Sequence, residues 1–232
     1  MNSRRMRPFR AYGGALAFVN QARALGFITL LLGTLAAPPA PAAPAAAATK
    51  IVAFGDSLTA GYGLKPSDAF PVRLKARLER DGYAVEIENA GVSGDTTSGG
   101  LARLDWAIAD HPDIVLLELG ANDALRGIDP KLTRANLDAM LARLTRDHIK
   151  VLLIGMEAPR NWGPEFDNAF DAIYPDLAKK YAVPLYPFFL DGVALDAKLN
   201  QGDGLHPNAA GVEVIVAKIA PAVERLVGPE ER

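Results

Sequence analysis

The chain has 232 residues, of which 50% are hydrophobic, and its 25 basic and 27 acidic side chains leave a formal net charge of −2. This balance, without a basic patch, excludes a nucleic-acid-binding surface. The chain has no cysteine, which excludes disulfides, thiol catalysis and thiolate metal sites.

Residues 1–48 have the composition of an export leader. Residues 1–23 carry five arginines and no acidic residue, residues 24–37 are an apolar stretch, and residues 38–48 are rich in alanine and proline. Ala45-Ala46-Ala47 supplies an A-x-A cleavage pattern, so the segment is predicted to be a secretory signal. An uncleaved anchor with an Ala/Pro stalk is the alternative, although 14 residues fall short of the roughly 20 that span a membrane.

The leader predicts an exported bacterial protein, periplasmic or secreted, with one mature domain over residues 49–232 and no membrane span after cleavage. An exported chain without disulfides fits a periplasmic enzyme better than a small secreted module. The pair Arg4-Arg5 occurs in twin-arginine signals, but 18 residues separate it from the apolar stretch, so Sec and twin-arginine export both stay open.

Apolar runs of strand length alternate with helical patterns along the mature chain. Tyr83, Val85 and Ile87 alternate with polar residues and predict an edge strand with one exposed face. The other predicted strands are apolar throughout and cover residues 51–54, 114–117, 151–154 and 183–186.

Helices are predicted where apolar residues recur every three or four positions. These patterns cover residues 70–78, 101–108, 137–144, 166–177 and 212–219. Asp129-Pro130 and Asn208 are good helix starts, and Pro175 should kink or break the helix that contains it.

This β-α-β-α series predicts an α/β domain, a parallel sheet covered by helices on both faces. In such sheets a ligand lies at the carboxyl ends of the strands. Ser57, Gly94 and Asn122 each follow a predicted strand, and His206 lies in the loop before the last helix. The chemically interesting residues are therefore expected at one edge of the sheet.

Ser57 follows Gly55-Asp56, where a glycine lets the chain turn sharply and leaves the hydroxyl exposed. A serine in this position can be an activated nucleophile or only the N-cap of a helix. The segment is not a G-x-S-x-G nucleophile elbow, because Thr59 occupies the last glycine position.

His206 differs from the other two histidines because Asp203 lies three residues before it. A carboxylate so close can hold the imidazole by Nδ1–H and leave Nε2 to accept a serine proton. A local turn contact is the alternative. His111 and His148 are predicted to be solvated turn residues.

Asn122 and Gly94 are candidate donors to an oxyanion. A side-chain amide at Asn122 and a backbone N–H at Gly94 can both face the same strand ends. Asn and Gly are also common turn residues, which is the plainer interpretation of each.

Taken in order, these segments resemble the conserved blocks of the GDSL, or SGNH, hydrolases. The blocks are Gly55-Asp56-Ser57-Leu58, Gly94, Gly120-x-Asn122-Asp123 and Asp203-x-x-His206. Further segments are similar to the periplasmic branch called thioesterase I, lysophospholipase L1 or arylesterase. These are Gly91-x-Ser93-Gly94-Asp95-Thr96, Leu125-Arg126-Gly127, Ala172-Ile173-Tyr174-Pro175 and Pro187-Phe188-Phe189.

The resemblance implies a three-layer αβα fold with a five-stranded parallel sheet in the flavodoxin-like order 2-1-3-4-5. It also implies an acyl-enzyme mechanism on an ester or thioester substrate, without a cofactor. By the resemblance Ser57 is the nucleophile, His206 the base and Asp203 the residue that orients it. The Ser57 and Gly94 N–H groups and the Asn122 amide form the oxyanion hole.

The acyl group is the open question. Leu125, Ile128 and Trp162 can bound an apolar groove for a lipid-like acyl chain, or they can pack into the core. No metal site is expected, because only one histidine lies near the proposed site. The segment Gly61-Tyr62-Gly63 begins like a dinucleotide loop, but Pro66 stands where a third glycine is needed.

Two other functions remain open from the sequence alone. A carbohydrate O-acetylesterase of the same superfamily would carry the same blocks. A non-catalytic ligand-binding protein could also use this scaffold.

Overall fold

The computed structural model of the protein describes residues 47–228. The leader predicted for residues 1–48 therefore lies almost wholly outside the described residues. Among the described helices, none is both long enough and apolar enough to cross a membrane.

The fold is built on a five-stranded sheet in the order β2-β1-β3-β4-β5, with every neighbouring pair parallel. This confirms the implied strand order. The strands are β1 (Thr49–Gly55), β2 (Val85–Gly91), β3 (Ile114–Glu118), β4 (Lys150–Ile154) and β5 (Leu185–Tyr186).

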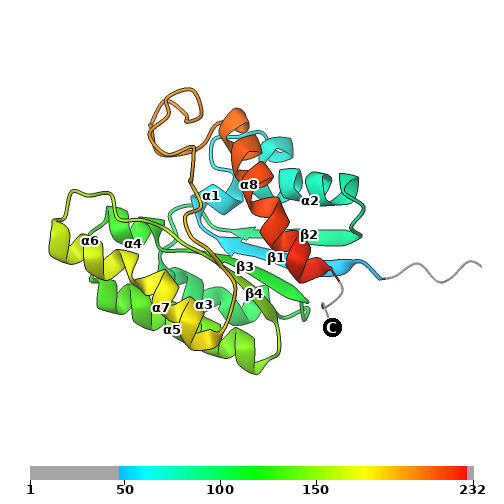
Figure 1. The fold of residues 1–232 in the computed structure, drawn as a ribbon, viewed down its shortest axis with the longest axis horizontal. Helices are drawn as coiled ribbons and strands as arrows, with labels where there is room; N and C mark the ends of the chain where they lie inside the picture. The colour runs from blue at the N-terminus through cyan, green and yellow to red at the C-terminus, as the bar shows by residue number, and fades with distance from the viewer. Residues whose placement is uncertain (1–46, 229–232) are drawn as a thin grey trace, which may run out of the picture. The chain divides into compact units, whose positions relative to one another are not determined.

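Helices cover both faces of the sheet, as the alternating pattern predicts. Helices α2 and α8 pack together on one face, while α3, α5 and α7 lie on the other (Figure 1). The helices are α1 (Ser57–Ala60), α2 (Phe70–Arg80), α3 (Thr97–Ala107), α4 (Ala121–Leu125), α5 (Pro130–Arg146), α6 (Pro164–Asp171), α7 (Ile173–Tyr181) and α8 (Ala209–Val227), with a 3₁₀ turn at Pro66–Asp68.

Strand β2 is an edge strand, which confirms the prediction from its alternating residues. Val85 is buried while Glu86 and Glu88 are exposed. Strand β5 is two residues long, shorter than the predicted 183–186, because Pro184 has no N–H to extend the ladder and the Val183 N–H bonds back to the Ala178 carbonyl.

The predicted helix over residues 166–177 is two helices, α6 and α7, that meet at Ala172. Pro175 lies in the first turn of α7, where its missing N–H costs little, and the break falls just before it. The predicted caps are confirmed: Asp129 Oδ1 accepts from Lys131 N at 2.9 Å, and Asn208 Oδ1 accepts from Ala210 N at 2.9 Å.

The core is continuous between the central strands and the helices. Every residue of β3 is buried, including Glu118, the one charged residue in it. Each fully buried Leu or Phe here contributes about 1.5–3 kcal/mol. The rigid ends of β1 and β3 carry the short helices α1 and α4 at the same edge of the sheet, which places their first residues side by side.

Candidate active site

Ser57 is the first residue of α1, and only Asp56 separates it from the end of β1. The helix is capped by Asp56, whose Oδ1 accepts from Leu58 N at 3.0 Å. Asp56 therefore does the capping that the alternative interpretation gave to Ser57. The serine hydroxyl is left free to face the loop that carries His206.

His206 and Asp203 complete a hydrogen-bonded chain with Ser57. His206 Nε2 lies 3.0 Å from Ser57 Oγ, and His206 Nδ1 lies 2.7 Å from Asp203 Oδ2. A carboxylate only accepts, so Nδ1 carries the proton and the Nε2 lone pair faces the serine. The structure thus joins two ends of the domain that are 149 residues apart in sequence.

Asp203 is itself held by its own loop. Its Oδ1 accepts from Leu205 N at 2.9 Å and from His206 N at 3.0 Å. These backbone N–H groups, together with the imidazole, lower the pKa of Asp203 to about 2. The carboxylate therefore keeps its charge throughout the pH range in which a histidine titrates.

Asn122 lies in the first turn of α4, and its amide is held at both ends. Its Nδ2 donates to Asp56 Oδ2 at 3.1 Å, while Oδ1 faces Arg126 Nη2 at 3.5 Å. Arg126 Nη2 also donates to the Gly94 carbonyl at 2.9 Å. Arg126 therefore links the two segments that carry Gly94 and Asn122.

The backbone N–H groups of Ser57 and Gly94 have no acceptor within residues 47–228. An unpaired backbone N–H can donate to a negatively charged oxygen. These are the groups that the sequence predicts as oxyanion donors.

Gln201 joins the segment after α1 to the loop that carries His206. Its Nε2 donates to the Tyr62 carbonyl at 2.7 Å and to the Pro207 carbonyl at 3.0 Å. Its backbone N–H donates to the His206 carbonyl at 2.7 Å. Gly63 makes room for this side chain, because a Cβ there would lie 2.1 Å from Gln201 Oε1.

Tyr62 covers one side of the imidazole. Its ring lies 4.7 Å from the His206 ring, centroid to centroid, at a tilt of 40°. Its backbone N–H donates to the Ser57 carbonyl at 3.1 Å. The tyrosine of the Gly61-Tyr62-Gly63 segment therefore packs against the histidine.

Trp162 and Leu125 are not core residues. Trp162 Nε1 donates to the Ala124 carbonyl at 2.8 Å, and its side chain and that of Leu125 stay about half exposed, at 47% and 45%. Ile128 is half-buried. Trp162 thus lies against α4, the helix that carries Asn122, and the core alternative is wrong for Trp162 and Leu125.

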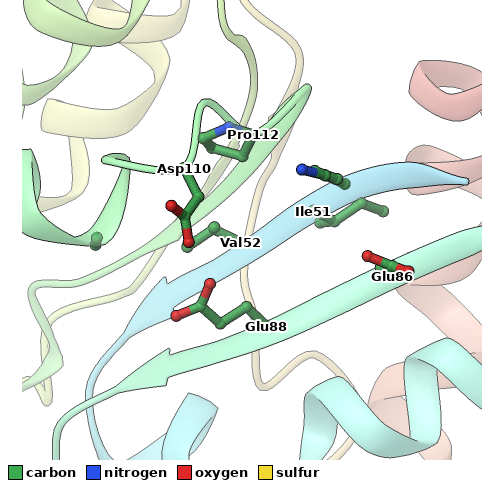
Figure 2. Close-up of a pocket in the computed structure, with 8 residues that line it drawn as sticks. Ile51, Val52, Glu86, Glu88, Asp110 and Pro112 are labelled. Atoms are coloured by element: carbon green, nitrogen blue, oxygen red, sulfur yellow. The ribbon is translucent and has the colours of Figure 1, made fainter.

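His111 and His148 lie in turns with φ of +50° and +59°, and both are exposed, which confirms their prediction as solvated turn residues. A pocket of about 150 Å³ lies elsewhere, along β1 and β2, where Glu88 and Asp110 flank Val52 (Figure 2). It contains no predicted site residue. Residues 47–228 contain no cluster of three His, Cys, Asp or Glu side chains that could hold a metal ion.

Comparison with known proteins agrees with this geometry. The sequence profile of the GDSL-like lipase/acylhydrolase family matches residues 53–214. The chain belongs to this family. Membership makes it an acylhydrolase, an enzyme that cleaves ester or thioester bonds.

Relatives within the GDSL family are similar over most of the chain. Esterase TesA of Pseudomonas aeruginosa is 38% identical over 183 residues, which cover 78% of this chain and 91% of that protein. Thioesterase 1/protease 1/lysophospholipase L1 of Escherichia coli K12 is 40% identical over 78% of this chain and 86% of its own. A crystal structure of TesA, 37% identical, superimposes with a TM-score of 0.73 over 77% of this chain and 99% of that one.

Three polar residues next to the site of this GDSL hydrolase were not predicted from its sequence. In the sequence Asp56 is only one residue of a conserved block, and nothing local distinguishes Gln201 from other polar loop residues. Glu118 could have been noticed, because it is a charged residue directly after the apolar run of residues 114–117.

We expect Gln201→Leu to lower kcat/KM for p-nitrophenyl butyrate by about 10- to 100-fold, because a shift of about 1 Å between catalytic groups has effects of this size. Loss of two hydrogen bonds should also lower the free energy of unfolding by about 1–3 kcal/mol. Steady-state kinetics and urea denaturation measure the two effects.

Gly63→Ala should reproduce the loss of activity by displacing Gln201. Gly82→Ala is the matched control, because Gly82 also has positive φ, at +95°, but has nothing within 4 Å of an added Cβ. It should lower stability and leave kcat/KM unchanged. Equal kinetic effects of the two alanine variants would contradict the role of Gln201.

Proposed function

We propose that Ser57 is the nucleophile of this acylhydrolase, His206 its general base and Asp203 the residue that orients the imidazole. The observation that supports this best is the chain of 3.0 Å and 2.7 Å contacts from Ser57 Oγ through the imidazole to Asp203 Oδ2. Serine alone is a poor nucleophile at neutral pH, and a base held by an acid activates it.

The reaction proceeds in two steps through an acyl-enzyme. Ser57 Oγ attacks the carbonyl carbon while its proton passes to His206 Nε2, and the carbonyl oxygen becomes an oxyanion. The intermediate then expels the alcohol or thiol, which takes the proton from His206. Water, activated by the same base, attacks the acyl-serine ester and releases the carboxylic acid and free Ser57.

The oxyanion is stabilised by the N–H groups of Ser57 and Gly94 and by the Asn122 amide. One such donor typically contributes a factor on the order of 10²–10³ in rate. The free N–H groups and the two-ended support of the Asn122 amide favour this role.

The substrate is a small ester or thioester whose acyl chain lies along Leu125, Ile128 and Trp162. Partial exposure of these side chains beside α4 supports the assignment. We also propose that residues 1–48 are a cleaved export signal and that the mature enzyme is periplasmic or secreted, on the composition of that segment.

Ser57→Ala should abolish hydrolysis of p-nitrophenyl acetate and labelling by a fluorophosphonate, with the fold retained. Rates, mass spectrometry of the labelled peptide and circular dichroism measure these three properties. Wild-type turnover in the variant, or label on another residue, would contradict the assignment.

The activity should fall as the pH drops from 7 to 5. The base must be unprotonated, and a free histidine is half protonated at about pH 6.5. Asp203, with its pKa lowered to about 2, stays charged and does not contribute to this fall. A pH profile of kcat/KM that stays flat down to pH 5 would exclude a histidine base.

Trp162→Ala and Ile128→Ser should reduce the preference for long acyl chains. Each buried methylene contributes about 0.8 kcal/mol, so the gain in kcat/KM per added methylene should shrink in both variants. Trp106→Ala is the control, because Trp106 lies on α3 and is 72% exposed. A chain-length profile from acetate to decanoate that is the same in the wild type and all three variants would contradict the proposed acyl groove.

A further inference from the structure

Two carboxyl groups are buried at the serine turn, the segment Gly55-Asp56-Ser57 between β1 and α1. Asp56 precedes Ser57, Glu118 ends β3, and neither carboxylate residue is exposed to solvent. The register pairs Phe54 with Leu117, which makes Gly55 and Glu118 neighbours. A Cβ on residue 55 would lie 2.4 Å from Glu118 Oε2, so glycine leaves the space that this carboxyl group fills.

The surroundings of Glu118 suit a neutral carboxylic acid. Its Oε2 accepts from Asp56 N at 3.3 Å and lies 2.7 Å from Thr59 Oγ1. Its Oε1 has no hydrogen-bond partner within the described residues. Part of any charge on this group would lie on Oε1, an oxygen without a donor in the core. Burial and the charge of the neighbouring Asp56 raise the pKa of Glu118 well above its usual value.

The surroundings of Asp56 suit a carboxylate. Both of its oxygens accept hydrogen bonds, Oδ1 from Leu58 N and Oδ2 from Asn122 Nδ2. Burial raises the pKa of Asp56 to about 6, and the hydrogen bonds from Leu58 and Asn122 oppose that rise. With hydrogen bonds to both oxygens, Asp56 is thus the member of the pair better suited to carry a charge, and Glu118 the member better suited to keep a proton.

Other charged groups around Asp56 act in both directions. Charge on His206 lowers the pKa of Asp56 and charge on Asp95 raises it. Asp95 is paired with Arg103 at 2.7 Å, and the Arg103 Nη2 donates to the Gly55 carbonyl at 2.8 Å. These opposing charges leave burial as the largest influence on Asp56.

The elements beyond Asn122 bring further polar groups close. Asp123 on α4 accepts from Thr97 N at 2.8 Å and from Thr133 Oγ1 at 3.0 Å, so its oxygens have partners of their own. Tyr174 on α7 donates to the Leu119 carbonyl, and burial raises its pKa well above the usual value, so it stays neutral.

We propose that Asp56 and Glu118 form a buried acid pair with a single negative charge, held on Asp56, and that this charge positions the Asn122 amide as an oxyanion donor. The inference rests on the proposed function of Asn122. A carboxylate accepts only from the NH₂ end of an amide, so Asp56 fixes which end of Asn122 faces the site and leaves its second N–H for the substrate. Glu118 holds the turn from below without adding a second charge.

A double-mutant cycle tests the positioning. Asp56→Asn, Asn122→Ala and the double variant are compared with wild type on p-nitrophenyl butyrate. Each single variant should lower kcat by about 10²-fold with little change in KM, because the contact acts in the transition state. The double variant should be no slower than Asn122→Ala, since Asp56 acts through Asn122. Multiplying losses would overturn the inference.

Glu118→Gln tests where the charge lies. A neutral isostere should leave the acid limb of the kcat/KM profile in place and restore most of the activity that Glu118→Ala loses. Native Glu118 keeps a proton that the unfolded chain releases, so wild-type stability should fall with rising pH relative to the variant. The Tm of Glu118→Gln minus that of wild type should therefore grow from pH 5 to pH 8.

An acid limb that moves to lower pH, with a constant difference in Tm, would place the charge on Glu118 and overturn the inference. Asp167→Asn is the matched control. Asp167 is also buried, and its Oδ1 also lacks a partner among the described residues, but it lies on α6. This control should change neither the acid limb nor kcat.

Fluorophosphonate labelling of Ser57 in the wild-type protein keeps the two proposals apart. Absence of label would contradict the proposed function, whatever the variants show. Label on Ser57 together with multiplying losses in the cycle would leave the proposed function standing and overturn only the role of the acid pair.

Discussion

The site depends on one hydrogen bond, the 3.0 Å contact between Ser57 Oγ and His206 Nε2, because it joins the first strand of the domain to the loop before its last helix. The sheet makes this contact possible by ending β1 and β3 at one edge. Gln201 supports it, since its side chain donates to the carbonyls of Tyr62 and Pro207, which lie in the two segments that the contact joins. The loop and α1 meet at that edge (Figure 1).

Below that contact, the serine turn satisfies a second constraint. Asp56 is at once the cap of α1 and the acceptor for the Asn122 amide, so one carboxylate orders both the nucleophile's helix and the adjacent amide. Glu118 fills the space that Gly55 leaves and binds the same turn from the sheet side. Burying two acids this close is costly unless one keeps its proton. The positions of the Asp56 and Glu118 carboxyl groups and of the Asn122 amide therefore depend on one another.

Local residue patterns predicted most of the fold correctly, in segments where a single signal, such as residue alternation or a helix cap, was present. The alternation in β2 marked an edge strand, and the caps at Asp129 and Asn208 marked two helix starts. The signal was weaker where a proline competed with an apolar run, as in β5, which is two residues long. Trp162 is a different case, because an aromatic side chain in a loop suits both a core and a surface, and only its exposure in the folded chain, 47%, decides between them.

The sequence by itself determined the family, the strand order implied by it and the identity of the residues at the centre of the site. Short blocks carry that information, because a turn, a nucleophile and a base each require particular residue types. Tertiary structure alone decided what lies between the blocks. Glu118 meets Asp56 through strand register, and Gln201 meets Tyr62 across 139 residues of chain. Contacts of this kind depend on the packing of distant segments, and no local spacing in the chain encodes them.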